Sequence, residues 1–286
     1  MPVLAQETID TFICVHQRDV DYLLELVLRS YQVNFLPKGT LTFVTNDLPH
    51  LQAFLDRTGA APNAVLTSDG DWLTAKEMEL PGWYKQQVIK LRAHQFCATP
   101  NFCNLGADTL LLQPINYADL VVGDLPALYY SQHVLLDKHV LYERQRVHNV
   151  ARILRVKPTI ALHYIDFIND VFCFNRTLLS KLNKHLELIY GQEYYFNLLR
   201  NLDNSEGDRK KFGEWTLYSV FLLDYLGVKP VLRNTRGAFL YQVHSQRTLY
   251  RYKFDTKAVH FVGKNFDLDY IKRRIKESGS VLSQSL

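Results

Sequence analysis

The sequence predicts an α/β protein with a mixed, mostly parallel sheet flanked by helices. Two observations carry this prediction. Short apolar runs alternate with amphipathic segments from residue 10 onward, which is the pattern of strands alternating with covering helices. The composition, with 47% hydrophobic and 22% charged residues over 286 positions, is that of a folded globular chain and excludes disordered and collagen-like classes.

Residues 10–66 contain three predicted strands and two predicted helices. Residues 10–16 read DTFICVH, a short apolar run that predicts a strand buried on both faces. Apolar side chains then recur every three or four residues over 20–31, which predicts a helix, and Asp19 or Asp21 would favour its N-terminus. Further strands are expected over 41–45 and 64–66, and a further helix over 51–57.

The rest of the chain continues the alternation. A helix is expected from about Trp83 to residue 91, and Thr99-Pro100 would end it. Strands are then expected over 102–105, 171–175 and 258–262, and helices over 140–154, 177–190, 214–226 and 266–276. The polar stretch 201–211 predicts a surface loop. Without repeats or a clear linker, we expect one domain over residues 1–276 and a disordered tail over 277–286.

The net charge, the cysteines and the N-terminal sequence indicate the class of partner and the cellular compartment. The formal net charge is +4, which is too small an excess to indicate a nucleic-acid partner. The four cysteines stand in apolar stretches and no pair has C-x-x-C spacing, which indicates free buried thiols. The N-terminus lacks a basic signal region, and no apolar run reaches the ~18 residues of a membrane span. We therefore expect a cytoplasmic protein.

The most informative stretch is FCNLGADTLLLQP, residues 102–114. A predicted buried strand ends there at Gly106-Ala107-Asp108. In open α/β sheets ligands bind at the carboxyl ends of the strands, and an aspartate at that edge can hold a divalent cation. The alternative is that Asp108 only caps a turn.

Two further groups of polar residues carry candidate chemistry. Gln86, Gln87 and Lys90 lie within the predicted helix after Trp83, where lysine suits a phosphate and glutamines suit sugar hydroxyls; alternatively they form a solvated helix face. Glu214 follows the polar loop and is the acid we favour for proton transfer, although it could serve only as a negative charge at a helix N-terminus.

Four segments in order resemble a group of bacterial glycosyltransferases of the GT-A fold. They are GWYKQQVIKL at 82–91, the turn ending at Asp108, FGEWTLY at 212–218, and VHFVGK at 259–264. The last segment is similar to the signature that closes the catalytic domain of glycogenin-like galactosyltransferases. The resemblance implies a Rossmann-like GT-A fold and sugar transfer from a nucleotide-sugar donor to a hydroxyl of a glycan or lipid-linked acceptor, in polysaccharide biosynthesis.

The resemblance also implies site residues. His16 and Arg18 follow the first strand, where such enzymes receive the nucleotide, and Gly263 and Lys264 would contact its phosphates. Glu214 would be the general base if the transfer inverts the anomeric centre, and would orient the sugars if it retains it. We expect His16 or Arg18, Lys90 and Asp108 to border one cavity.

The chain departs from the family pattern at its metal motif. The first acid of the D-x-D turn is replaced by Gly106, and the closing signature lacks its Pro-Trp after Lys264. Binding of Mn²⁺ or Mg²⁺ could be weakened, absent, or completed by water or another acid. We expect His260 to lie close enough to Asp108 for both to reach one cation or one diphosphate.

Alternatives from other classes stay open. The Gly106 substitution motivates a non-catalytic nucleotide- or sugar-binding protein on the same fold. The interleaved basic and aromatic residues at 247–253 motivate, more weakly, a nucleic-acid-binding module. The basic helix over 266–276 is a candidate for peripheral contact with an anionic membrane, where lipid-linked acceptors are found.

Overall fold

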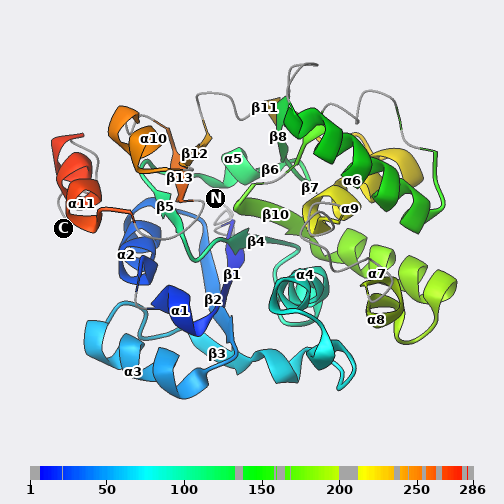
Figure 1. Ribbon diagram of the computed structural model, residues 1–286, viewed down its shortest axis with the longest axis horizontal. Helices are drawn as coiled ribbons and strands as arrows, with labels where there is room; N and C mark the ends of the chain where they lie inside the picture. Colours follow the sequence, from blue (N-terminus) through cyan, green and yellow to red (C-terminus); the bar gives the residue numbers. More distant parts are fainter. Residues whose placement is uncertain are drawn as a thin grey trace, which may run out of the picture.

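A five-stranded sheet forms the centre of the computed structural model (Figure 1). The structure describes residues 7–20, 22–132, 138–157, 159, 165–167, 169–199, 212–234, 239–243, 245–252, 256–261, 266–278 and 282. The side chains of residues 18, 132, 138–143 and 251 lie outside this description.

The strands and helices have the following bounds. The strands are β1 Ile9–Val15, β2 Lys38–Thr45, β3 Val65–Ser68, β4 Asn101–Leu105, β5 Thr109–Leu111, β6 Val121–Val122, β7 Leu125–Pro126, β8 Leu128–Gln132, β9 Ile165–Asp166, β10 Val171–Asn175, β11 Leu232–Asn234, β12 Leu240–Val243 and β13 Ala258–Phe261. The α-helices are α1 Gln17–Val20, α2 Leu24–Asn34, α3 Leu48–Thr58, α4 Gly82–Arg92, α5 Tyr117–Leu120, α6 Lys138–Leu154, α7 Arg176–Tyr190, α8 Tyr194–Leu199, α9 Glu214–Val220, α10 Gln246–Arg251 and α11 Leu268–Glu277.

The central sheet has the strand order β10-β4-β1-β2-β3. β4, β1, β2 and β3 are parallel, so their carboxyl ends share one edge of the sheet. β10 pairs antiparallel to β4, with Val171 opposite Leu105, and therefore brings its amino end to that same edge. The predicted mixed, mostly parallel α/β fold is confirmed.

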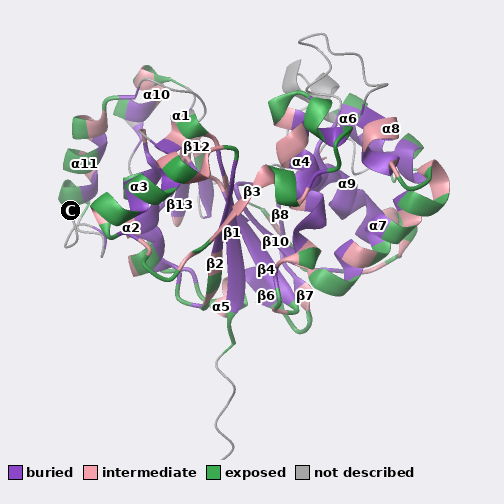
Figure 2. Ribbon diagram, turned by 90° about the horizontal axis from the view of Figure 1, so that it is seen from below, coloured by how far each residue is buried: buried purple, intermediate pink, exposed green. Residues whose placement is uncertain are grey.

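Helices cover both faces of this sheet (Figure 2). α2, α3 and α11 lie on one side, and α4, α7, α8 and α9 on the other. Because successive side chains of a strand point to opposite faces, Ile13 of β1 joins the first core and Phe12 the second. This two-sided burial is the reason that residues 12–15 of β1 form an uninterrupted apolar run.

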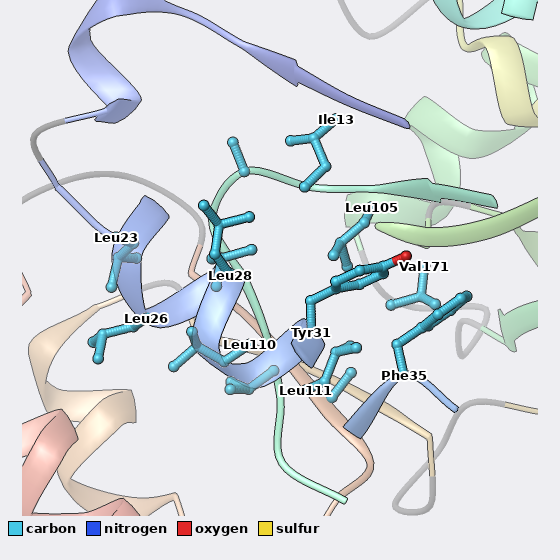
Figure 3. Close-up of a cluster of buried hydrophobic side chains, with 14 of the residues drawn as sticks. Ile13, Leu23, Leu26, Leu28, Tyr31, Phe35, Leu105, Leu110, Leu111 and Val171 are labelled. Carbon is cyan, nitrogen blue, oxygen red and sulfur yellow. The ribbon is translucent and has the colours of Figure 1, made fainter. Parts of the chain in front are cut away.

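The first core is built around α2. Its residues Leu28 and Tyr31 pack with Leu105 of β4 and Leu110 of β5 (Figure 3). β5 in turn pairs antiparallel with β13, in a three-stranded sheet of order β12-β13-β5. The turn between β4 and β5 is thus held between the central sheet and a strand from the C-terminal part of the chain.

Several boundaries differ from the sequence predictions. The helix expected over 20–31 is two helices, α1 and α2, and the Tyr22 N–H donates to the Asp19 carbonyl oxygen in the turn between them. The helix expected over 214–226 is α-helical only to Val220, and residues Phe221–Tyr225 form a π-helix. Residues 201–211 and most of the predicted tail lie outside the described residues; within the tail, Leu282 is buried.

The basic helix α11 uses its apolar face inside the protein. Ile271 and Ile275 are fully buried, while Lys272, Arg273 and Lys276 are exposed. A contact between α11 and an anionic membrane would therefore rely on charge alone. Within the described residues, no helix combines the length and apolar character needed to cross a bilayer.

Candidate functional site

A cavity of about 370 Å³ opens at the carboxyl edge of the central sheet. Its walls come from segments far apart in the sequence: the ends of β1 and β4, helix α4, helix α6, the start of β10, the start of α9, and β13. Its polar lining side chains are Asp19, Gln86, Gln87, Lys90, Asn104, Asp108, Arg146, Asp170, Glu214 and His260. Convergence of polar groups from several strand ends is typical of a ligand site in this class of fold.

Asp108 lies in the turn from β4 to β5, and β-pairing brings His260 to it. His260 of β13 is opposite Thr109 of β5, and the Asp108 carbonyl oxygen accepts the Phe261 N–H at 3.1 Å. The His260 Nε2 atom lies 3.5 Å from Asp108 Oδ1. The expected proximity of these two side chains is confirmed, and the carboxylate–imidazole donor set suits Mn²⁺ or Mg²⁺.

The other imidazole nitrogen meets a second carboxylate. His260 Nδ1 lies 2.6 Å from Oδ2 of Asp170, the residue that precedes β10. Burial alone would lower the pKa of His260, but the negative charges of Asp170 and Asp108 outweigh it and raise that pKa to about 10. Burial alone would likewise raise the pKa of Asp170, whereas the charge of His260 lowers it. Three ionisable groups therefore share one corner of the cavity.

A buried ion pair lies elsewhere on the cavity wall. Lys90 Nζ is 2.8 Å from Glu214 Oε1, and the two side chains are 12% and 2% exposed. The Lys90 ammonium also lies 4.4 Å from the ring centroid of Trp215. Burial would lower the pKa of Lys90, but the charge of Glu214 outweighs burial and raises it. Lys90 is thus a permanent positive charge rather than part of a solvated helix face.

The neighbouring glutamines have different positions on α4. Gln87 is buried and its Oε1 atom accepts the Glu214 backbone N–H at 3.3 Å, so it links α4 to the start of α9. Gln86 is half-buried and lines the main cavity. Glu214 stands at the first position of α9, as the sequence predicts, but its carboxylate is held by Lys90 rather than by solvent.

A smaller cavity of about 70 Å³ adjoins the first, and Cys14 and Gln86 line both. Its lining includes His16 after β1, Thr45 at the end of β2 and Asn46 directly after β2. Lys90 and Asp108 border one cavity as expected, but of the two alternatives that were expected beside them, His16 or Arg18, His16 does not line that cavity and lies on the β2 side of the edge. The side chain of Arg18, and all of Gly263 and Lys264, lie outside the described residues.

Three charged side chains of the main cavity were not predicted as site residues, and one of them, Asp19, was expected only to favour a helix N-terminus. Asp170 precedes the apolar run of β10, and its position at this edge depends on the antiparallel direction of that strand. Arg146 lies on α6, is buried, and has its Nη1 atom 3.7 Å from Asp166 Oδ1. The sequence signal for Asp170 was a charged residue directly before an apolar run. The signal for Arg146 was a cation among the apolar positions of a predicted helix.

Gly106 has no room for a side chain. A Cβ atom there would lie 2.7 Å from Thr109 Oγ1, 3.0 Å from Asp170 Cβ and 3.1 Å from Asp108 Oδ1. The Gly106 N–H donates to the Asp170 carbonyl oxygen at 2.8 Å, which keeps the two backbones together. Among the described residues, no three His, Cys, Asp or Glu side chains have the mutual spacing of an assembled metal site.

Comparison with known proteins supports the fold. The chain is similar to the apo structure of the bifunctional glycosyltransferase WbbM, with a TM-score of 0.53 and 11% identity over 96% of this chain. It spans about half the length of that protein, covering 50% of it. At this identity the likeness shows the fold alone, which is a GT-A-like glycosyltransferase fold.

Two further solved structures are more distant. The galactosyltransferase LgtC in complex with donor and acceptor sugar analogs has a TM-score of 0.48 and 14% identity, covering 97% of this chain and 96% of that one. A mycobacterial protein has a TM-score of 0.48 and 13% identity, covering 95% of this chain and 72% of that one. No curated protein matches the sequence. A family profile does match, over residues 4–246, and the chain therefore belongs to DUF6492, a family of unknown function.

Proposed function

We propose that this protein is a glycosyltransferase that moves a sugar from a nucleotide-sugar donor to a hydroxyl of a glycan or lipid-linked acceptor. The observation that carries the proposal is the convergence of Lys90, Glu214, Asp108 and His260 on one cavity, although up to 170 positions separate them in the sequence. A site for a charged, hydroxyl-rich donor needs cations, carboxylates and amides on one concave surface.

The two cavities divide the donor between them. The smaller one, with His16, Thr45 and Asn46, would hold the nucleoside, and the larger one the diphosphate and sugar. Gln86 lines both and can donate and accept hydrogen bonds at the junction. Lys90 is a buried positive charge that would attract the diphosphate.

Asp108 and His260 are the residues that would hold Mn²⁺ or Mg²⁺. The ion would neutralise the charge that develops on the diphosphate leaving group. The carboxylate and imidazole converge within 3.5 Å and face the cavity, so the donor set fits such an ion.

Glu214 would act on the acceptor side. In an inverting transfer its carboxylate takes the proton of the acceptor hydroxyl; in a retaining transfer it orients the two sugars and the leaving phosphate takes the proton. In both cases the Lys90 ammonium, 2.8 Å from Glu214 Oε1, holds the carboxylate in one position.

A panel of nucleotide sugars, screened by thermal shift and by release of the nucleoside diphosphate with and without Mn²⁺, tests the proposal. At least one donor should raise the melting temperature and be hydrolysed slowly, and Asp108→Asn and His260→Ala should abolish hydrolysis. Asp56→Asn on the outer surface of α3 is the control and should keep wild-type turnover. Wild-type turnover in both site variants would refute the site assignment.

The same screen separates the second candidate, a non-catalytic nucleotide- or sugar-binding protein, which the missing acid at Gly106 favours. Such a protein would show a thermal shift with a nucleotide sugar or nucleotide but no hydrolysis under any metal condition.

A further inference from the structure

Arg146 lines the main cavity from a helix position that an apolar side chain would ordinarily occupy. Arg146, Val150 and Ile153 follow one another at helical spacing on α6, and all three are buried. A guanidinium carries a permanent positive charge, and burying a charge is unfavourable unless an opposite charge meets it. A cation on the inward face of a helix, at the wall of a ligand cavity, is therefore a candidate for binding an anion.

Gly213, the residue before α9, makes room for the Arg146 side chain. α6 lies beside α9 (Figure 1), and a Cβ atom on Gly213 would lie 3.0 Å from Arg146 Cδ and 3.5 Å from Arg146 Nε. The backbone of Gly213 is extended, with φ −158°, which any residue can adopt, so the close approach of Arg146 is what a larger side chain would disturb. Arg146 is thus held next to the residue that precedes Glu214.

The two cations contributed by α4 and α6 differ in where their counter-charges lie. Lys90 is matched inside the cavity wall by Glu214, whose Oε1 atom is 2.8 Å away. The counter-charge of Arg146 is Asp166, whose Oδ1 atom is 3.7 Å from Arg146 Nη1 and which is not among the described residues that line the cavity. The planar fork of five N–H donors lets a guanidinium hold a counter-ion on one side and the paired oxygens of a carboxylate or phosphate on another.

The position of Arg146 favours the acceptor side of the cavity over the donor side. The smaller cavity, assigned to the nucleoside, meets the main one at Cys14 and Gln86, and Arg146 does not line it. Glu214, assigned to the acceptor hydroxyl, directly follows the glycine that Arg146 approaches. An anionic group held by Arg146 would therefore lie beside the hydroxyl that faces Glu214.

We propose that Arg146 binds an anionic group of the acceptor, a carboxylate or a phosphate, and so selects an acidic sugar or a phosphate-linked sugar as the molecule that is glycosylated. The word acceptor rests on the proposed function, whereas the binding of the anion does not. The guanidinium would donate to two oxygens of the group at once, which neither lysine nor a neutral side chain can do with the same geometry. The missing side chain of Gly213 keeps that fork close to the proposed base.

Binding of small glycosides to the unmodified protein, measured by ligand-observed NMR titration without donor, is the first test. Methyl β-D-glucuronide carries a carboxylate, and its neutral counterpart is methyl β-D-glucoside. Glucosyl citronellyl phosphate carries the phosphate of a lipid-linked sugar, and its neutral counterpart is citronellyl glucoside. At least one anionic probe should bind about tenfold more tightly than its counterpart, and the one that does identifies the source of the anion. Affinities within about twofold for both pairs, or no binding of either anionic probe, overturn the inference.

Variants of α6 provide the second test. Arg146→Gln should weaken binding of the preferred anionic probe by about tenfold and leave that of its neutral counterpart within about twofold, while Arg146→Lys should recover only part of the loss. The control Arg152→Gln removes an exposed cation from the same helix and should bind both probes as wild type does. If Arg146→Gln does not fold, the double variant Arg146→Met/Asp166→Asn, which removes both charges of the pair, takes its place. Wild-type affinity for the anionic probe in the folded variant overturns the inference.

Kinetics with a nucleotide sugar that the protein hydrolyses separate this inference from the proposed function. The preferred anionic probe should leave the KM for that donor within about twofold, because the two ligands occupy different parts of the cavity. A KM that rises in proportion to probe concentration assigns Arg146 to the donor subsite and overturns the inference, while glycosyl transfer stands. If binding of the anionic probe depends on Arg146 but no nucleotide sugar is bound or turned over, the proposed function fails and the anion-binding subsite stands.

Discussion

Replacing Lys90 with methionine should destabilise the protein strongly. Methionine keeps much of the aliphatic chain and its contact with Trp215 but removes the ammonium that lies 2.8 Å from Glu214 Oε1. The Glu214 side chain is 2% exposed, so its charge would remain buried and uncompensated. Breaking a buried ion pair on one side costs about 3–5 kcal/mol of the free energy of unfolding.

Urea denaturation followed by circular dichroism measures this loss. With an m-value of about 3 kcal/mol/M, the midpoint should fall by about 1–1.7 M. The double variant Lys90→Met/Glu214→Gln removes both charges, and its loss should be at least ~2 kcal/mol smaller than the sum of the two single losses.

An exposed pair of the same length provides the control. Lys76 Nζ lies 2.7 Å from Glu193 Oε2, but these side chains are 53% and 40% exposed. Because exposed pairs contribute only about 0–1 kcal/mol, Lys76→Met should shift the midpoint little. A Lys90→Met loss below ~1 kcal/mol, or one equal to that of Lys76→Met, would refute the argument that burial makes this pair costly to break.

Three other predictions concern the site and its support. Gly106→Asp should lower the free energy of unfolding by about 1–3 kcal/mol, because its Cβ atom would lie 2.7 Å from Thr109 Oγ1. The control Gly82→Ala, whose Cβ atom would have no atom within 4 Å, should be close to neutral, and equal urea midpoints for the two variants would contradict the prediction. Asp10→Ala should lower the free energy of unfolding by about 3–5 kcal/mol, because the Asp10 carboxylate accepts hydrogen bonds from the backbone N–H groups of residues 40, 98 and 99 at 2.7–3.0 Å. Asp10→Asn should lower it less, and a loss under ~1 kcal/mol for Asp10→Ala in urea denaturation would contradict the prediction. Burial raises the pKa of Cys14 to about 12, so only about one thiol in 10⁴ is ionised at pH 8. Labelling of Cys14 with iodoacetamide, measured by mass spectrometry, should therefore be slow and about tenfold faster per pH unit, and rapid labelling of the folded protein at pH 8 would contradict the raised pKa.

Local sequence patterns were sufficient to predict the strands and helices whose own residues have a clear apolar pattern. The run at 10–16 predicted β1 because a strand covered on both faces needs apolar residues at consecutive positions, and Ile13 and Phe12 do pack on opposite faces. The order of strand, turn and Asp108 likewise placed that acid at the carboxyl edge of an interior strand, where the structure has it. His260 near Asp108 was expected from the order of motifs, and the β5–β13 pairing provides the physical cause.

Local patterns failed where a long-range contact decides the conformation. The apolar spacing over 20–31 continues across the break between α1 and α2, so periodicity alone could not reveal the break. The isolation of His16 in the smaller cavity follows from where the chain turns after β1, which depends on the neighbouring strand and not on the sequence around residue 16.

The charge pairing of the site was decided by the tertiary structure alone. Lys90 and Glu214 are 124 positions apart, and each by itself is a plausible surface residue of a helix. Asp170 reads as an acid before a strand, and only the antiparallel direction of β10 brings it to Gly106 and His260. The sequence by itself determined which segments become strands and helices, because that choice depends on neighbours within a few residues. Strand direction and the meeting of distant side chains depend on how whole layers bury their apolar faces, and so only the folded chain determined them.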